Sequence, residues 1–290
     1  MTEFVEEKAY AKLNISLDVT GKRPDGYHDM SMVMQTVSLS DTVKIMPGRG
    51  EGISAACNVP FIPSDDRNLA VKAAKLFCAA AGILSPSIHI RIDKIIPVGA
   101  GLAGGSADAA AVLRGMNRRY DYPLSETELM NIAGDTGSDV AFCLKGGTML
   151  ATGRGEVLKT LPDMPDCFYV ICKPSFSVST PELFKKLDEI RLRHHPDTAG
   201  IEKALQDRNL KEICRRMYNV FEDTGDRRLQ TIADIKGSLL DFSALGSVMT
   251  GTGSAVFGVF DSTYPARKAA EELKRKYGFA VVAENIKELI

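Results

Sequence analysis

The chain has 290 residues, enough to bury one large core or two smaller ones. Its 36 Lys and Arg residues are balanced by 37 Asp and Glu, so no bulk charge draws it to nucleic acid or a membrane surface. The N-terminus is acidic and lacks the apolar stretch of a signal peptide, and no apolar run reaches membrane-spanning length. We therefore expect a cytoplasmic protein without nucleic-acid or membrane partners, in which local groups meet any anionic ligand.

The six cysteines form no Cys-x-x-Cys pair and no regular framework. Most of them lie in apolar runs. This pattern predicts free, buried thiols in a reducing compartment.

The first clear element is a strand over residues 9–19, in which apolar residues take the odd positions 13–19 and polar residues the even positions 12–18. Such alternation predicts a half-buried strand with one polar, solvated face. A turn-rich loop, "TGKRPDGYHD", follows at 20–29. Strand-like stretches come next, around 32–39 and 41–46.

A helix is predicted over 68–82, with Gly82 as its C-terminal stop. The alternating stretch 87–96 predicts a strand that leads into a glycine-rich loop. Beyond Ser106 the pattern indicates a helix to about Arg119, a second from Ser125 to about Asp135, a short one from Ser138, and glycine-punctuated strands over 146–158.

The stretch 159–167 contains two prolines and few apolar residues, so it is the best candidate for a domain boundary. The remainder predicts a strand at 168–174, amphipathic helices between 180 and 241, strands near 246–253 and 255–260, a helix at 265–278 and a final strand at 279–286. We therefore expect an α+β protein with two layers in each half.

The loop "PVGAGLAGGSADAA" (97–110) raises the first functional question. It formally fits a dinucleotide fingerprint, but the strand before it alternates polar residues at 89, 91 and 93, unlike a buried central parallel strand. It also lacks the Gly-Lys-Ser/Thr end of a Walker loop. Its backbone N–H groups, with Ser106 as N-cap of the next helix, could cradle a phosphate. A plain tight turn is the alternative.

Three more features each have an ordinary structural explanation when taken singly. Asp139 stands at the start of the short helix, where acidic residues are favoured. Lys12 is on the polar face of its strand, where a lysine is usually solvated. The glycine-rich turn "TGTGS" at 250–254 suits a bulged hairpin corner.

Taken together and in this order, these segments resemble the GHMP small-molecule kinases, whose motifs are an N-terminal lysine strand, a glycine-rich phosphate loop and a late glycine-rich turn. The stretches "AYAKLNISLDVTGKRPDGYHDM", "DDRNLAVKAA", "GSDVAFCLKGG" and "FSVSTPELF" are similar to the branch that phosphorylates the 2-hydroxyl of a diphosphocytidyl sugar alcohol in non-mevalonate isoprenoid precursor synthesis. The similarity spans nearly the whole chain, and "RPDGYH" is its most specific part.

The resemblance implies a two-domain GHMP kinase fold, with a ribosomal-S5-like N-terminal half and a ferredoxin-like C-terminal half. Residues 1–160 would form the ATP-binding domain and residues 161–290 the substrate-binding domain, with the site in the cleft between them. It also implies ATP and Mg²⁺ as cofactors and a cytidine diphosphate sugar alcohol as the small-molecule substrate. We expect a monomer or a weak homodimer.

The same resemblance implies a role for individual residues. Asp139 would be the catalytic base, with Lys12 close enough to keep it ionised and to stabilise the transferring phosphoryl group. Tyr27 and Phe184 would sandwich the cytosine, His28 would hydrogen-bond its edge, and Asn14 and Thr180 would help to hold the substrate. No residue is assigned as a metal ligand. The implied ATP-binding residues are Asn68, Leu69, Lys94, Pro97, Gly99, Gly101, Leu102, Ala103, Gly104, Gly105 and Ser106.

The chain departs from the family pattern at Ala103, which replaces a glycine, at Ala107, which replaces a serine, and at Ala141, which replaces a proline. A methyl group at Ala103 matters if that residue needs a positive φ. Two alternatives stay open. The chain could be a GHMP kinase for another small alcohol, such as mevalonate or homoserine, or a catalytically silent relative that senses a ligand.

Overall fold

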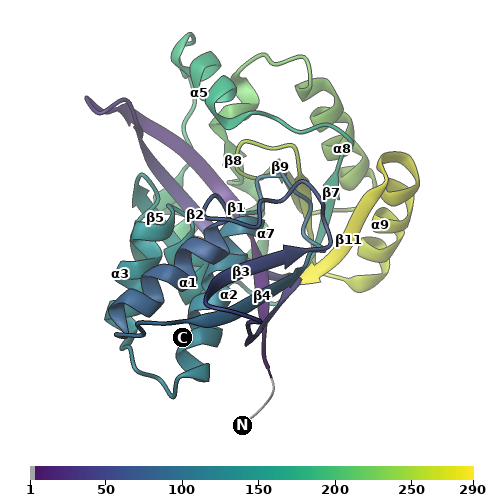
Figure 1. The fold of residues 1–290 in the computed structure, drawn as a ribbon. Coiled ribbons are helices and arrows are strands. Elements are labelled where there is room, and N and C mark those ends of the chain that lie inside the picture. Colours follow the sequence, from purple (N-terminus) through teal and green to yellow (C-terminus); the bar gives the residue numbers. More distant parts are fainter. Residues whose placement is uncertain (1–3) are drawn as a thin grey trace.

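The computed structural model describes residues 4–290, which form two β-sheets with their helices (Figure 1). The long strand β2 organises the first sheet, because it pairs with β1, β4 and β5 at different points along its 20 residues. The order along the sheet is β3-β4-β2-β1-β8, and β5 and β6 continue from β2. The seven strands are β1 (Val5–Lys22), β2 (His28–Pro47), β3 (Gly52–Cys57), β4 (Ser87–Asp93), β5 (Thr148–Gly153), β6 (Val157–Thr160) and β8 (Tyr218–Asn219).

The helices of the first half gather beside this sheet (Figure 1). They are α1 (Leu69–Ala80), α2 (Gly104–Arg119), α3 (Glu126–Thr136) and α4 (Val140–Lys145). The central helix α2 packs on β1 and β2 and is rich in buried alanines. Small side chains let the helix approach the strands closely, so the residues at its N-terminus are held rigidly against the sheet.

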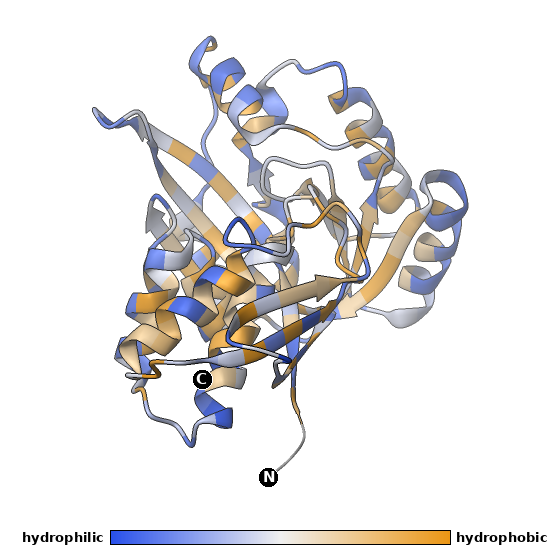
Figure 2. Cartoon of the chain, viewed as in Figure 1, coloured by the Kyte–Doolittle hydropathy of each residue, from blue (hydrophilic) through white to orange (hydrophobic). Residues whose placement is uncertain are grey.

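The second sheet is antiparallel throughout, in the order β11-β7-β10-β9. Its strands are β7 (Phe168–Lys173), β9 (Gly246–Met249), β10 (Val256–Phe260) and β11 (Phe279–Glu284). Helices α8 (Leu229–Asp241) and α9 (Thr263–Tyr277) pack on it. In Figure 2, α9 is mostly hydrophilic, whereas the strands beside it are hydrophobic. The other elements are α5 (Thr180–Asp188), α6 (Thr198–Gln206), α7 (Leu210–Arg215) and the 3₁₀ turn η1 (Val220–Asp223).

The α+β prediction is confirmed, with several changes in detail. The predicted strands at 32–39 and 41–46 are one continuous strand, β2, and the short strands β3 and β8 were not predicted. The predicted boundary at 159–167 covers the last two residues of β6 and the segment from there to β7, and the division into two domains stays a prediction. All six cysteines are free and five are buried, as expected. No helix within residues 4–290 is long and apolar enough to span a membrane.

The polar face of β1 is buried, so the prediction of a solvated face is wrong. Lys12 is 4% exposed and Asn14 is completely buried. The second half of the chain covers this face: the Asn14 side chain accepts from the Gly251 N–H at 3.0 Å, and Asp18 Oδ1 lies 2.8 Å from His195 Nδ1. The alternation in the sequence therefore separates an apolar face from a polar face, and both are buried. The polar face contacts the second half of the chain.

The two glycine-rich turns of the chain contact each other. The Ala255 N–H donates to the Ala100 carbonyl at 3.1 Å, and Thr250 Oγ1 donates to the Gly101 carbonyl at 3.2 Å. Gly101 has a φ of +77°, and a Cβ there would lie 2.1 Å from the Thr250 carbonyl oxygen. Only glycine allows this approach, so the loop after β4 and the turn after β9 form one unit.

We expect Gly101→Ala to lower the free energy of unfolding by about 3 kcal/mol, because the methyl group meets backbone and the left-handed conformation is strained. Gly134→Ala is the matched control. Gly134 lies inside α3 and a Cβ there would meet no atom within 4 Å, so the change should stabilise by up to about 1 kcal/mol. Urea unfolding of both variants checks this, and equal effects would contradict it.

Candidate active site

A cavity of about 940 Å³ opens between the two glycine-rich turns, the β1–β2 hairpin and α5. Every predicted site residue except Asn14 lines it. Lys12 and Asp139 are both among the lining residues although they are far apart in the sequence. The structure therefore brings the predicted catalytic, nucleotide-binding and substrate-binding residues to one place.

The glycine-rich loop ends in the N-terminus of α2, which lines this cavity. The first helical hydrogen bond runs from the Ala107 N–H to the Ala103 carbonyl at 2.8 Å, so the N–H groups of Gly104, Gly105 and Ser106 precede it. Unpaired N–H groups and the positive end of a helix attract anions. The loop thus has the geometry of a phosphate cradle.

The predicted N-cap at Ser106 is wrong, because the helix begins two residues earlier, at Gly104. Ala103 is the N-cap, in the left-handed conformation with φ 56°, and no side chain caps the helix. The sharp left-handed bend turns the chain into the helix before the serine is reached. Ser106 therefore lies in the first turn of α2, where its hydroxyl lines the cavity and has no hydrogen-bond partner within residues 4–290.

Lys12 is a buried cation without a counter-charge. Its Nζ donates to Asn14 Oδ1 at 2.5 Å, and no carboxylate of the described chain forms an ion pair with it. A buried ammonium group without a partner is costly. The free-energy cost of burying this ammonium group is offset when an anionic ligand binds next to it.

Asp139 is the N-cap of α4, as predicted, and its carboxylate makes no hydrogen bond or ion pair within residues 4–290. Asp139 and Lys12 both influence the buried thiol of Cys143. Burial raises the pKa of Cys143, the Asp139 carboxylate raises it further, and the Lys12 ammonium opposes the shift. The two unpaired charges therefore act on one buried group, one turn along α4.

Asn14 does not line the cavity, so a direct contact with the substrate finds no support in the structure. Its side-chain oxygen accepts hydrogen bonds from Lys12 Nζ and from the Gly251 N–H at 3.0 Å, and it lies 3.3 Å from Thr250 Oγ1. Asn14 thus ties Lys12 to the late glycine turn and fixes the position of its Nζ.

At the other end of the cavity, the predicted aromatic sandwich is not preformed. The Phe184 ring stacks on the His28 imidazole, with centroids 4.6 Å apart and planes inclined by 25°, and its edge meets Phe221. Tyr27 is 57% exposed and lies under the guanidinium of Arg154, 5.2 Å from its ring centroid. Nearby, the Thr180 and Thr252 hydroxyls are 2.9 Å apart, which links α5 to the late glycine turn.

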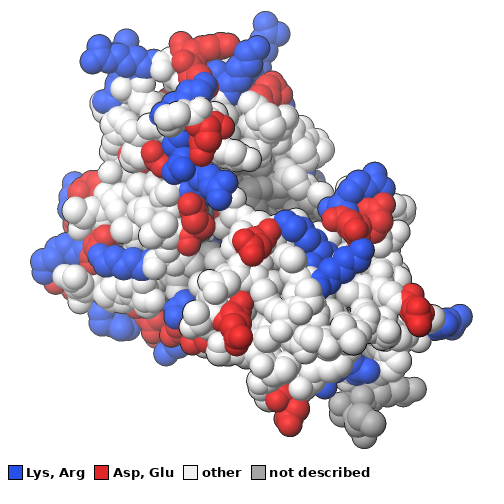
Figure 3. Space-filling model, turned by 60° about the vertical axis from the view of Figure 1, so that its left-hand side comes forward, with Lys and Arg blue, Asp and Glu red and all other residues white. Residues whose placement is uncertain are grey.

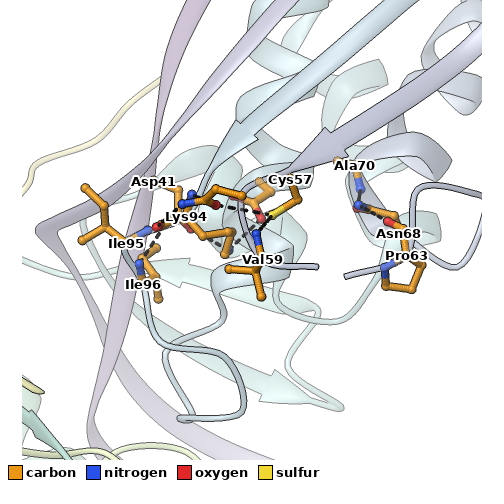
Figure 4. A network of polar contacts seen from close by, with 11 residues as sticks. Asp41, Cys57, Val59, Pro63, Asn68, Ala70, Lys94, Ile95 and Ile96 are labelled. Atoms are coloured by element: carbon orange, nitrogen blue, oxygen red, sulfur yellow. Dashed lines mark hydrogen bonds and ion pairs between the residues drawn. The ribbon is translucent and has the colours of Figure 1, made fainter. Parts of the chain in front are cut away.

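The predicted nucleotide residues outside the loop have structural partners of their own (Figure 4). Asn68 caps α1 by accepting from the Ala70 N–H at 3.0 Å, and its amide donates to the Pro63 carbonyl at 2.8 Å. Lys94 is held between Asp41 at 2.6 Å and Asp108 at 2.7 Å. Its charge is compensated, unlike that of Lys12.

Asp108 was not predicted as a site residue. Burial raises its pKa to about 7 against the attraction of Lys94, and its Oδ1 is buried without a hydrogen-bond partner. It stands two residues beyond Ser106 on α2 and lines the cavity. A carboxylate so near the phosphate loop could have been noticed in "GGSADAA", where it is the first acidic residue.

The cavity has a local excess of positive charge. Five Lys or Arg side chains line it against three Asp side chains, in a chain of net charge −1. Figure 3 shows charges of both signs scattered over the viewed face, so no extended patch of one charge covers it. Arg67, Arg154, Lys185 and Asp188 belong to this set and were not predicted, because single charged residues in loops and on helix faces carry no motif.

We expect Ala103→Gly to raise the free energy of unfolding by about 1 kcal/mol, because it relieves an L-residue in the left-handed region. The matched control is Ala79→Gly, the same change at an exposed position of α1, which should lower stability by up to about 1 kcal/mol. Chemical denaturation measures both. Destabilisation of the same size at 103 and 79 would show that the bend at Ala103 is not strained.

Comparison with known proteins agrees with this geometry. The family models for the GHMP kinases N-terminal domain and the GHMP kinases C-terminal domain match residues 68–147 and 201–278. The chain is 45% identical, over 93% of its length and 96% of the relative's, to a 4-diphosphocytidyl-2-C-methyl-D-erythritol kinase of Clostridium botulinum. It is 43% identical to the protein of that name in Acetivibrio thermocellus, over 98% and 100% of the two chains.

Solved structures show the same fold. A crystal structure of a 4-(cytidine 5'-diphospho)-2C-methyl-D-erythritol kinase matches with a TM-score of 0.80 and 32% identity, over 96% of this chain and 98% of that one. Homoserine kinase from Cytophaga hutchinsonii matches with a TM-score of 0.75 and 18% identity, over 99% and 96% of the two chains. The latter likeness concerns the fold alone. The expected GHMP kinase fold type is confirmed, while the domain bounds 1–160 and 161–290 stay a prediction.

Proposed function

Because this chain belongs to the GHMP kinase family, we propose that it transfers the γ-phosphoryl group of ATP to the 2-hydroxyl of 4-diphosphocytidyl-2-C-methyl-D-erythritol. One observation carries the proposal. Lys12 and Asp139 are unpaired charges of opposite sign that line the same cavity as the N-terminus of α2.

The nucleotide end of the reaction follows from the loop. Phosphoryl transfer has a loose transition state, so positioned donors and cations supply most of the catalysis. The N–H groups of Gly104, Gly105 and Ser106 would hold phosphate oxygens, and Lys12 would neutralise charge on the transferring group. The phosphate oxygens would then supply the negative charge that the buried Lys12 ammonium lacks among the described carboxylates.

The acceptor end requires a proton acceptor. The Asp139 carboxylate has no partner that would compete for its lone pairs, so it can accept the proton of the attacking hydroxyl. In a loose transition state the hydroxyl loses its proton late, and an ordinary carboxylate is basic enough. Asn14 fixes the position of Lys12 Nζ, and Lys12 lines the same cavity as Asp139.

The residues present fit a magnesium ion that arrives with the nucleotide. Within residues 4–290 no cluster of three or more His, Cys, Asp or Glu could hold a resident ion, and Mg²⁺ is commonly bound by one or two protein groups plus phosphate oxygens. The Ser106 hydroxyl and the unpartnered Asp108 Oδ1 are the groups that would hold it. When bound, it would neutralise charge on the β- and γ-phosphates.

The cytidine end would lie between the β1–β2 hairpin and α5. We expect the base to lie between Tyr27, which closes from the exposed side, and Phe184, with its edge toward His28. Stacking contributes about 1–3 kcal/mol per base. Thr180 would hold the substrate where its hydroxyl meets Thr252. Both halves of the chain contribute to this end.

The alternatives are weaker. A kinase for mevalonate or homoserine has no use for the aromatic cluster of Tyr27, His28 and Phe184. A silent ligand sensor was suggested by the altered loop, but Ala103 adopts the left-handed bend without a glycine. The monomeric or weakly dimeric state and the cytoplasmic location expected from the sequence stay predictions.

We expect Asp139→Asn to lower kcat at least a hundredfold, because the amide cannot accept the hydroxyl proton, while the fold is retained. Asp163→Asn is the matched control, since Asp163 is exposed and lies outside the cavity. Phosphorus-31 NMR of enzyme, Mg²⁺-ATP and the diphosphocytidyl substrate follows the new phosphomonoester directly.

Turnover by the Asp139→Asn variant within threefold of the control would remove Asp139 from the mechanism. Tight binding of the substrate by the unaltered protein, without any phosphomonoester signal, would favour the silent sensor.

A further inference from the structure

Asp188, the last residue of α5, joins the helix to the β1–β2 hairpin. Its Oδ1 lies 2.7 Å from His28 Nε2 and its Oδ2 lies 2.5 Å from Lys22 Nζ. Both Asp188 and His28 line the cavity. Neither the sequence motifs nor the mechanism above gives Asp188 a role.

The carboxylate is ionised at neutral pH. Hydrogen bonds from Lys22 and then from His28 lower the pKa of Asp188 below its usual value. An ionised carboxylate can only accept hydrogen bonds. The 2.7 Å contact therefore requires the proton on Nε2 of His28.

Two contacts of the His28 imidazole fix the orientation of the ring as well as the position of its proton. One ring face stacks on Phe184 at 4.6 Å and the Nε2 edge meets Asp188, so the ring cannot turn without losing one of these contacts. The other nitrogen, Nδ1, has no hydrogen-bond partner in the described part of the chain. In a neutral imidazole with Nε2 protonated, Nδ1 carries a lone pair and accepts.

Such an acceptor distinguishes two pyrimidines. Cytosine carries an exocyclic amino group at C4, which donates, whereas uracil carries a carbonyl oxygen there, which only accepts. An Nδ1 lone pair would bind the first and repel the second. A site that hydrogen-bonds one group rejects an analogue that cannot supply it, because a buried polar atom is left unpaired.

We propose that Asp188 is a positioning residue that holds His28 in the Nε2-protonated tautomer, so that Nδ1 accepts a hydrogen bond from the cytosine amino group and uracil is rejected. The inference rests on the proposed function, because it concerns the base of that substrate.

The variant Asp188→Asn tests it sharply. Lys22 can only donate, so the amide oxygen should face Lys22 and the amide NH₂ should face His28, which forces Nε2 to accept and Nδ1 to carry the proton. We expect the ratio of kcat/KM for the cytidine substrate over its uridine analogue to fall about tenfold or more. The loss should lie mainly in KM, since the phosphoryl-transfer groups are untouched.

Lys22→Met is the matched control, because it removes the other ion pair of Asp188 and leaves the contact with His28. We expect this variant to keep the base preference of the unaltered enzyme. If Lys22→Met and Asp188→Asn lower the ratio equally, Asp188 acts only by fastening α5 to the hairpin, and the proposal is overturned.

Nitrogen-15 NMR of the imidazoles reads the tautomer without catalysis. The chain has four histidines, and His28→Gln identifies the signals of His28. We expect a protonated Nε2 and an unprotonated Nδ1 in the unaltered protein and the reverse in Asp188→Asn. An unaltered protein with the proton on Nδ1 would refute the proposal.

The two levels of inference fail differently. If neither the cytidine nor the uridine compound is phosphorylated, the proposed function is wrong, and so is the proposed recognition of cytosine. If the cytidine compound is phosphorylated and Asp188→Asn keeps the original preference, the function stands and the role of Asp188 does not.

Discussion

The site depends on a close contact between two glycine-rich turns that belong to different halves of the chain. Gly101 and Thr250 approach so closely that no side chain fits at 101. The Asn14 side chain joins the late turn to Lys12, and the Lys12 N–H donates to the Leu102 carbonyl of the first turn at 3.2 Å. This contact places a lysine from the first strand, the N-terminus of α2 and a turn of the second sheet around one cavity. Without it the polar face of β1 would meet water and Lys12 would be an ordinary surface lysine.

The same arrangement explains how a nearly neutral protein can bind a polyanion. Backbone N–H groups, helix polarity and a small excess of lining cations create a positive site that bulk charge does not reveal. Lys12 and Lys94 show two uses of a buried lysine. Lys94 is neutralised by Asp41 and Asp108 and holds the structure together, whereas Lys12 is left without a carboxylate and is available to a ligand.

Much of this could be predicted from the sequence where the signal is local. The alternation of β1, the glycine loop before α2 and the aspartate at the start of α4 are all local patterns, and the resemblance to a family joined them into one site. What failed depended on tertiary contacts. Burial of the polar face of β1 requires His195 and the turn at 250–253, and the stacking of His28 on Phe184 requires α5 to lie against the hairpin. Ser106 was misplaced as N-cap because a left-handed alanine at 103 cannot be anticipated from propensity.

The central claim is that Lys12 and Asp139 meet at the end of a triphosphate that is held by the N-terminus of α2. A crystal structure with a non-hydrolysable ATP analogue and the diphosphocytidyl substrate tests it most directly. The account predicts that phosphate oxygens contact the N–H groups of residues 104–106, and that the γ-phosphorus lies between Lys12 Nζ and the substrate hydroxyl, with the Asp139 carboxylate within hydrogen-bond distance of that hydroxyl. A triphosphate bound elsewhere, or a hydroxyl out of reach of Asp139, would contradict it.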